Sequence, residues 1–244
     1  MSPRMPVMLG PDPVFPPVEL ALREPDGLLA VGGDLSVPRL LAAYRSGIFP
    51  WFSAGQPILW WSPDPRMVFR TEGGVRLSSK FRRGLRQSAW TVRADTRFDE
   101  VIDACATIRR PGQRGTWIVP AMRRAYGVLH EQGHAHSIEV FDSERLVGGL
   151  YGVSIGAMFF AESMYSGQSG ASKVALAALA HRLREWGWPL IDAQVENDHL
   201  LRMGAESLPR DAFQRIVAAQ VAIAVEPGPW TARFGELSAP ALAA

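Results

Sequence analysis

Three polar side chains stand at the ends of apolar segments in the second half of the chain. Glu162 follows the apolar run 157–161, and Asp192 and Gln194 lie in the segment LIDAQV at 190–195. In a strand, residues two apart share a face, so we expect Asp192 and Gln194 to point the same way. A buried carboxylate needs partners, and the three residues together predict a pocket with an apolar part and an anionic part. The alternative is that each carboxylate is satisfied locally, for example by a backbone N–H.

A second unusual segment is GIFPWFSAGQPILWWSPDPR at residues 47–66, which holds three tryptophans, two phenylalanines and four prolines. Proline fixes φ and lacks an N–H, so we expect this segment to be irregular and to carry its aromatic side chains on loops. Such side chains either pack one domain onto another or form a platform on which a base stacks. The SPDPR end of the segment is the expected boundary between a small N-terminal domain, residues 1–64, and a larger domain, residues 65–244.

The basic residues of the 244-residue chain are concentrated in its first half. Residues 1–130 hold 18 Lys or Arg against 11 Asp or Glu, whereas residues 131–244 hold 8 against 13, and 24 of the 26 basic residues are arginine. A coding bias toward arginine explains part of the total but not the clustering. Residues 75–94 and 105–130 each contain at least five basic residues and no acid, so either run could follow an RNA backbone. The RNA-binding candidates are Lys80, Arg82, Arg83 and Arg86.

Two short motifs suggest other chemistry. HEQGH at 130–134 matches the H-E-x-x-H pattern of zinc proteases, in which two histidines four apart on a helix bind one metal. Gly133 is expected to end the helix before His134, so we predict no metal site and expect the histidines to bond backbone at a turn. GQSGA at 167–171 is one residue short of a G-x-S-x-G nucleophile elbow, and a serine there, Ser169 or Ser172, is expected to cap the following helix.

Hydrophobic periodicity predicts an α+β fold. Thr96 and Asp99 are expected to form a capping box at the start of one helix. The single cysteine, Cys105, excludes an internal disulfide, and with no secretory signal or membrane-length apolar run a cytoplasmic location is expected. The expected helices span 38–46, 96–110, 120–132 and 171–186, and the expected strands span 138–141, 145–153, 157–162 and 189–195.

Nine motifs, in their order along residues 15–213, resemble the leucyl/phenylalanyl-tRNA-protein transferases of bacteria. The resemblance implies an enzyme that moves leucine or phenylalanine, and possibly methionine, from aminoacyl-tRNA to a protein with an N-terminal Arg or Lys, marking it for degradation. It also implies a C-terminal domain with an acetyltransferase-like (GNAT) core. The motifs are REPDGLLAVGGDL, GIFPWF, ILWWSPDPR, GTWI, HAHSIEV, LVGGLYGV, ESMYS, ASK and LIDAQ, which begin at residues 23, 47, 58, 115, 134, 146, 162, 171 and 190.

The resemblance also assigns roles to individual residues. Asp192, aligned with Gln194 and Glu162, would bind the acceptor amine and relay its proton toward the leaving ribose hydroxyl. Strict alternation puts Phe159 opposite Glu162, so its assignment requires a bulge or a strand end. No metal or cofactor is expected, because an aminoacyl ester is already activated toward an amine. Trp51, Trp117 and Tyr126 would hold the 3′-terminal adenosine and the ester, and Leu150, Phe159, Met164, Leu179 and Ile191 would line the pocket for the amino-acid side chain.

Two other classes of protein remain possible from the sequence. An acyl-CoA N-acyltransferase would share the core, but the R/Q-x-x-G-x-G/A loop that binds the pyrophosphate is incomplete, since Arg109 and Gly112 begin it and Arg114 interrupts it. A non-catalytic RNA-binding protein would explain the basic half of the chain. It would leave the convergence of Glu162 and Asp192 in the acidic half unexplained.

Overall fold

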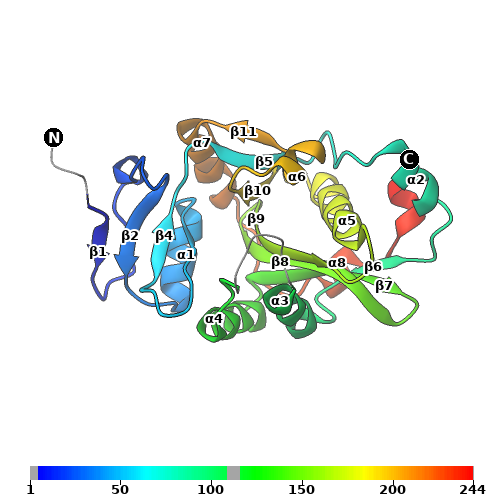
Figure 1. Cartoon of the computed structure of the whole chain (residues 1–244), viewed down its shortest axis with the longest axis horizontal. Coiled ribbons are helices and arrows are strands. Elements are labelled where there is room, and N and C mark those ends of the chain that lie inside the picture. The colour runs from blue at the N-terminus through cyan, green and yellow to red at the C-terminus, as the bar shows by residue number, and fades with distance from the viewer. Residues whose placement is uncertain (1–4, 109–115, 244) are drawn as a thin grey trace.

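The computed structural model describes residues 5–108 and 116–243 as a mixed α/β protein with two β-sheets. The smaller sheet lies at one end of an elongated molecule, and the larger sheet fills the rest (Figure 1). Buried side chains of both parts, among them Tyr44, Trp60 and Phe160, belong to one apolar cluster. The sheet of the N-terminal residues ends at Trp61 and the next strand begins at Arg66, and the domain division at residues 64 and 65 stays a prediction.

The smaller sheet has the strand order β1-β2-β4-β3 and is accompanied by α1 (Val37–Arg45). Pro38 lies in the first turn of α1, where its missing N–H costs no hydrogen bond, and Gly47 follows the helix with a left-handed backbone (φ 63°). These two residues bound the helix, and the prediction for 38–46 is confirmed. The strands are β1 (Val7–Leu9), β2 (Leu28–Gly32), β3 (Phe49–Pro50) and β4 (Leu59–Trp61).

The larger sheet has the order β11-β5-β10-β9-β8-β7-β6-β12. Its neighbouring strands are antiparallel, except that β9 and β10 run parallel. The expected meander of three strands is confirmed as β7, β8 and β9, each longer than predicted. The strands are β5 (Arg66–Arg70), β6 (Thr91–Ala94), β7 (Ala135–Asp142), β8 (Arg145–Ile155), β9 (Met158–Ser166), β10 (Leu190–Gln194), β11 (Glu206–Leu208) and β12 (Leu237–Ser238).

Helices cover both faces of the larger sheet. Figure 1 shows α5 on one face and α3 with α4 on the other. The basic residues Arg109, Arg110 and Arg114, and the pattern that was compared with a pyrophosphate loop, lie outside the described residues. The remaining helices are α2 (Ser79–Leu85), α3 (Phe98–Thr107), α4 (Pro120–Glu131), α5 (Ala171–Glu185), α6 (Asp198–Arg202), α7 (Arg210–Val221) and α8 (Thr231–Phe234).

Two predicted helix caps are wrong. At α3 the N-cap is Arg97, and Thr96 instead donates its N–H and its hydroxyl to the carboxylate of Glu139 on β7. A buried carboxylate in the sheet therefore takes the donors that a capping box would have used. At α5 the N-cap is Gly170 (φ 88°), because this position has a left-handed backbone, and Ser172 donates its N–H to the Ser166 hydroxyl.

Two β-bulges interrupt the larger sheet where β9 and β10 separate. Opposite β8, Ser163 pairs with Tyr151 and Ala161 with Gly152, so Glu162 is an extra residue of β9. The assignment of Phe159 to the side-chain pocket required such a bulge, but Phe159 does not line the cavity described below. On β10, Asp192 and Gln194 pair with consecutive residues of β5, and Gln194 has a left-handed backbone (φ 64°). The regular alternation predicted for 190–195 is therefore wrong at this point, because a bulge re-aims the side chains that follow it.

Substitution of Gly152 by alanine is expected to destabilise the protein by about 2 kcal/mol or more. A Cβ there would lie 2.3 Å from the carbonyl oxygen of Phe160 and 2.6 Å from the Phe159 ring, beside the bulge at Glu162. Urea unfolding measures the change. The control is Gly84→Ala on α2, where a Cβ meets nothing within 4 Å, and where we expect stabilisation by about 0.5 kcal/mol. Equal stability of the two variants would contradict the close packing at Gly152.

Candidate active site

Asp192 is fully buried and bound to Arg66 of β5. Arg66 donates from Nε to Oδ1 (2.7 Å) and from Nη2 to Oδ2 (2.6 Å), the paired geometry that makes arginine–carboxylate bonds strong. The guanidinium also lies over the rings of Phe49 and Phe213, each 4.7 Å away. Asp192 has no exposed surface and lines neither cavity of the site, and its expected contact with a substrate amine stays a prediction.

Of the two carboxylates predicted at the site, Glu162 is the one that lines a cavity. Tyr44 of α1 donates to Oε1 (2.7 Å) and Tyr126 of α4 donates to Oε2 (3.0 Å). The two hydroxyl oxygens also lie within hydrogen-bonding distance of each other, a contact that has a proton of its own only when Glu162 is protonated. Gln194 donates from Nε2 to Oε1 (2.7 Å). The predicted convergence of Glu162 and Gln194 is therefore observed, and two tyrosines complete it.

Burial has the largest effect on the pKa values of Glu162 and the two tyrosines. Removal from water raises the pKa of Glu162 to about 7, with a smaller contribution from the negative charge of Asp192, while the hydrogen bonds from Tyr44, Tyr126 and Gln194 act in the opposite direction. Burial also raises the pKa of both tyrosines well above the usual value, so they remain donors. Glu162 can thus gain or lose a proton near neutral pH, as a general acid or base must.

Two neighbouring cavities open on either side of Glu162. The first, about 280 Å³, is mainly apolar, and the second, about 270 Å³, is bordered by aromatic side chains. The residues common to both linings are Glu162, Ala193, Gln194, Asn197 and Leu200. The carboxylate of Glu162 and the carboxamide of Gln194 therefore lie at the border between an apolar cavity and an aromatic one.

The first cavity contains only part of the predicted side-chain pocket. Leu150, Met164 and Ile191 line it, but Phe159 and Leu179 are fully buried and do not. Phe159 packs its ring against Trp230, 5.6 Å between centroids, and belongs to the same apolar cluster as the buried residues of α5. Other lining residues were not predicted from the sequence. One of them, Leu176, lies three residues before Leu179 on the same helix, a spacing that places both on one face. These missed residues include Phe69 of β5, Leu176 of α5 and Leu200 of α6.

The second cavity contains two of the three residues predicted to hold an adenosine. Trp51 and Trp117 line it together with Phe49 and Pro50. Trp51 is 39% exposed and is fixed by Trp61, whose Nε1 donates to the Trp51 carbonyl (2.7 Å). Tyr126 is fully buried behind Glu162 and lies outside the lining, because its hydroxyl is used by the carboxylate.

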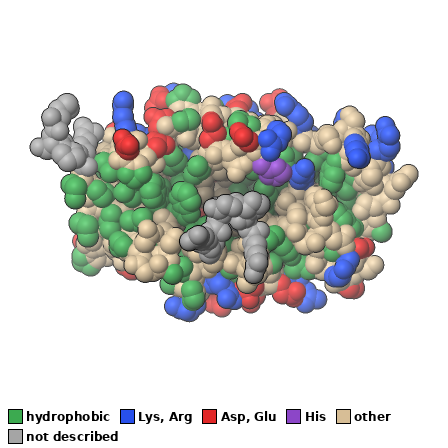
Figure 2. Space-filling view, viewed as in Figure 1, with side chains coloured by type: hydrophobic (Ala, Val, Ile, Leu, Met, Phe, Trp, Pro, Cys, Tyr) green, Lys and Arg blue, Asp and Glu red, His purple; other side chains and the backbone are tan. Residues whose placement is uncertain are grey.

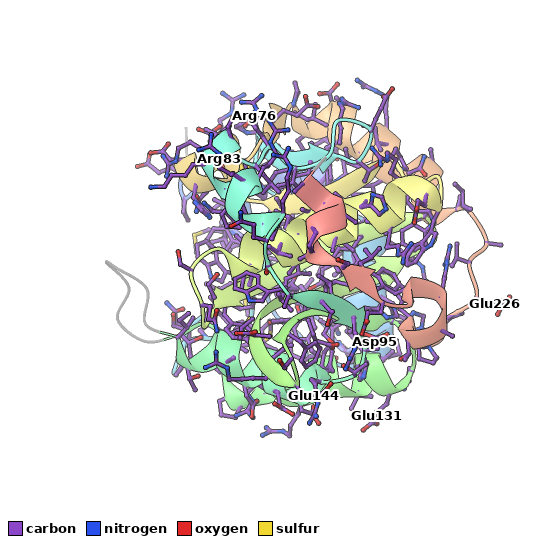
Figure 3. All side chains as sticks on the ribbon, turned by 90° about the vertical axis from the view of Figure 1, so that its right-hand side faces the viewer. Arg76, Arg83, Asp95, Glu131, Glu144 and Glu226 are labelled. Carbon is purple, nitrogen blue, oxygen red and sulfur yellow. The ribbon has the colours of Figure 1, made fainter. Side chains whose placement is uncertain are left out.

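The predicted RNA-binding residues lie on or directly after α2, at the end of the molecule away from the smaller sheet (Figure 1). Lys80, Arg83 and Arg86 are exposed and Arg82 is half-buried. Figure 3, which views this end, shows Arg83 projecting outward near Arg76. Arg86 is partly used within the protein, since its Nη2 donates to the Ala243 carbonyl (3.1 Å).

The HEQGH motif is divided by the end of α4 at Glu131. His130 lies on the helix with Nδ1 2.9 Å from the Ala135 carbonyl oxygen, and Gly133 has a left-handed backbone (φ 74°) before His134. The predicted end of the helix is thus confirmed, as is the backbone bond of His130. Within residues 5–108 and 116–243, no three His, Cys, Asp or Glu side chains are arranged to hold a metal ion.

Comparison with known proteins identifies the family of this chain. The family model for leucyl/phenylalanyl-tRNA protein transferase matches residues 68–218, and the model for the N-terminal domain of the same transferase matches residues 33–64. The chain belongs to this family. It is 67% identical over 241 residues to the leucyl/phenylalanyl-tRNA-protein transferase of Xanthomonas euvesicatoria pv. vesicatoria, a match that covers 98% of this chain and 96% of the relative.

Other relatives give the same result. The transferase of Xylella fastidiosa is 60% identical over 233 residues, which covers 95% of this chain and 96% of the relative. The chain is thus an enzyme of the aminoacyltransferase class. Among solved structures, L-PGS from Bacillus licheniformis matches with a TM-score of 0.37 and 10% identity, over 70% of this chain and 54% of that one, a likeness too weak to carry an argument.

The surface of the transferase shows where it is apolar. Figure 2 shows hydrophobic side chains grouped over the smaller sheet at one end of the molecule and charged side chains along the two long edges of this face. No helix in the described part of the chain is long and apolar enough to cross a bilayer.

Replacing Glu162 by glutamine is expected to make the protein relatively more stable as the pH rises. The folded wild type binds this proton more tightly than the unfolded chain does, so ionisation between about pH 4.5 and about pH 7 lowers its free energy of unfolding. From the shift of the pKa, the advantage of Glu162→Gln over wild type should grow by roughly 2 to 3 kcal/mol between pH 5 and pH 8. Urea unfolding at both pH values measures it, and a constant difference would refute the raised pKa.

Proposed function

We propose that this transferase moves leucine or phenylalanine, and possibly methionine, from aminoacyl-tRNA to the N-terminal Arg or Lys of an acceptor protein in the cytoplasm, and so marks that protein for degradation. The observation that carries the proposal is the pair of cavities that meet at Glu162 and Gln194. One is apolar and one is aromatic, which suits a substrate with an aliphatic or phenyl side chain at one end of an ester and an adenosine at the other. We further propose that residues 65–244 form a GNAT-like domain and residues 1–64 a smaller one.

The reaction needs an amine, an ester and a route for one proton. The acceptor α-amine, with a pKa near ~8, is partly neutral at neutral pH and attacks the ester carbon. The new C–N bond forms as the C–O bond to the ribose breaks, and the amine proton passes to the leaving ribose oxygen. Glu162 lies between the two cavities and titrates near pH 7, so it is the proposed group that binds the amine and passes on the proton.

The amide Gln194 is proposed to orient this carboxylate. Its Nε2 donates to Oε1 of Glu162 on the edge that faces both cavities. Asp192 is proposed to position Gln194, because its Oδ1 accepts the backbone N–H of Gln194 (2.9 Å). No metal or cofactor has a part in this scheme, since the ester bond is already activated and positioning can supply much of the acceleration.

The aromatic segment 47–66 is proposed to form the wall on which the last base of the tRNA stacks. Phe49, Pro50 and Trp51 border the second cavity together with Trp117, and unpaired bases commonly stack on aromatic side chains. In the first cavity, Leu150, Met164 and Ile191 would contact the leucyl or phenylalanyl side chain. The basic residues of α2 are proposed to contact the tRNA phosphates farther from the ester.

Transfer of radiolabelled leucine from charged tRNA to a peptide that begins with Arg tests the proposal. We expect Glu162→Gln to lower kcat/KM by about 100-fold or more, because the amide can neither hold the amine by charge nor accept its proton. The matched control is Glu139→Gln, which changes another buried carboxyl whose pKa is raised by burial but which lines neither cavity. Its folded fraction should retain wild-type kcat/KM.

Each possible failure of this assay points to a different protein class. Wild type that binds charged tRNA but transfers nothing would favour an RNA-binding protein without catalysis. Thermal stabilisation by coenzyme A would favour an acyl-CoA N-acyltransferase. Equal transfer to peptides that begin with Arg and with Ala would contradict the proposed acceptor.

Replacement of Arg83 or Lys80 by alanine is expected to weaken tRNA binding. It should also lower the slope of log Kd against log salt by about one unit for each phosphate that the variant no longer neutralises. Filter binding at several salt concentrations measures both quantities. Arg145→Ala, at a 69% exposed side chain in β8, is the control and should change neither. An unchanged slope in the α2 variants would place the RNA-binding surface elsewhere.

A further inference from the structure

Arg66 joins the segments that meet at the active site, although it lines neither cavity. Its side chain is 1% exposed. Besides the two bonds to Asp192 of β10, it donates from Nη1 to the Gly47 carbonyl (3.0 Å), and its guanidinium lies over the rings of Phe49 and Phe213. All three nitrogens of the guanidinium thus donate to the segments that surround the site.

One branch of these contacts leads to the reacting groups. Oδ1 of Asp192 accepts from Arg66 and also from the backbone N–H of Gln194. That N–H holds Gln194 in a left-handed backbone (φ 64°), which a residue with a side chain rarely adopts without support. The conformation aims the Gln194 amide at Glu162, 2.7 Å from Nε2 to Oε1. Arg66 therefore supports one of the three donors of Glu162, Gln194, through Asp192.

The other branch leads to the aromatic wall of the second cavity. The Gly47 carbonyl and the Phe49 ring are both fixed on the Arg66 guanidinium, and Phe49, Pro50 and Trp51 border that cavity. The same side chain therefore determines where the base would stack and where the amine would be held.

We infer that Arg66 is a positioning residue for aminoacyl transfer, setting the distance between the aromatic wall and the Gln194–Glu162 pair without touching the substrate. The inference rests on the proposed function. It requires arginine in particular, because the planar fork supplies the parallel bonds to Asp192 and a third donor to Gly47, whereas a lysine ammonium at the end of a flexible chain cannot match all three directions.

The alternative is that Arg66 merely neutralises a buried charge and contributes to folding alone. Buried ion pairs are often weak contributors to stability, and removal of one partner can unfold a protein for reasons unrelated to catalysis. A test must therefore separate geometry from charge and activity from folding.

The first variant is Arg66→Lys, which keeps the positive charge and removes the fork. Its matched control is Arg39→Lys in α1, where the arginine is also fully buried and bonded to the carbonyls of Gly10 and Pro11, away from both cavities. For the folded fraction, measured by urea unfolding, we expect Arg66→Lys to lower kcat at least ten-fold with KM for aminoacyl-tRNA raised as well, and Arg39→Lys to leave both unchanged. Wild-type kinetics in Arg66→Lys would overturn the inference.

The second variant is Asp192→Asn, read by the pH dependence of kcat. The groups that face Glu162 are Tyr44 from α1, Tyr126 from α4, Asp192 and Gln194 from β10, and His199 and Glu196 across the cavities. Removal of the Asp192 charge while Arg66 stays positive should move the acid limb of the profile to lower pH. Arg66→Lys should lower the rate and leave the limb in place.

The activity of the wild type distinguishes a failure of the proposed function from a failure of the inference on Arg66. If it transfers no amino acid, the proposed function fails, and with it the inference. If wild type transfers normally while Arg66→Lys matches it, the inference fails and the proposed function stands.

Discussion

A carboxylate that is removed from water must accept hydrogen bonds from the protein or become protonated. Glu162 is close to the balance of these two effects, because burial raises its pKa and three hydrogen bonds lower it. Its donors come from three separate elements, Tyr44 on α1, Tyr126 on α4 and Gln194 on β10. The positions of those elements follow from this demand, because each donor must lie within bonding distance of the same two oxygens. The partial mismatch between burial and bonding leaves the pKa of Glu162 near 7 rather than at its usual value.

Two bulges in the larger sheet, rather than its regular strand pairing, place Glu162 and Gln194 near each other. β9 and β10 are paired at Phe159 and Phe160 and then separate, and each strand carries a bulge at the point of separation. A bulge re-aims a side chain at little cost to the rest of the ladder. Glu162 and Gln194 thus face each other across a gap that two regular strands would have closed by backbone bonds.

Much of the fold could be predicted from the sequence because the signals were local. Pro38 and Gly47 bound one helix, Pro120 and Gly133 mark the limits of another, and period-two patterns gave the meander. The caps failed where a distant group intervened, since Glu139 took the Thr96 donors. Glu162 and Gln194 were expected near the cavities because they end apolar segments, and Leu150, Met164 and Ile191 because of the family resemblance. Tyr44 and Arg66 were not expected, because their contacts span 118 and 126 residues of chain. Sequence spacing carries no information about such contacts.

The contact of Tyr44 with Glu162 links the two ends of the fold in a way that bears on how such chains can change. A hydroxyl from the helix beside the smaller sheet lowers the pKa of a carboxyl group in the larger sheet that burial has raised, and the neighbouring Asp192 is neutralised by an arginine that also holds the Gly47 carbonyl. Neither part contains a finished site by itself. The N-terminal segment is therefore not an interchangeable module. Its replacement by the equivalent segment of a distant relative would change the hydrogen bond that Glu162 accepts, and with it the pKa of this carboxyl group.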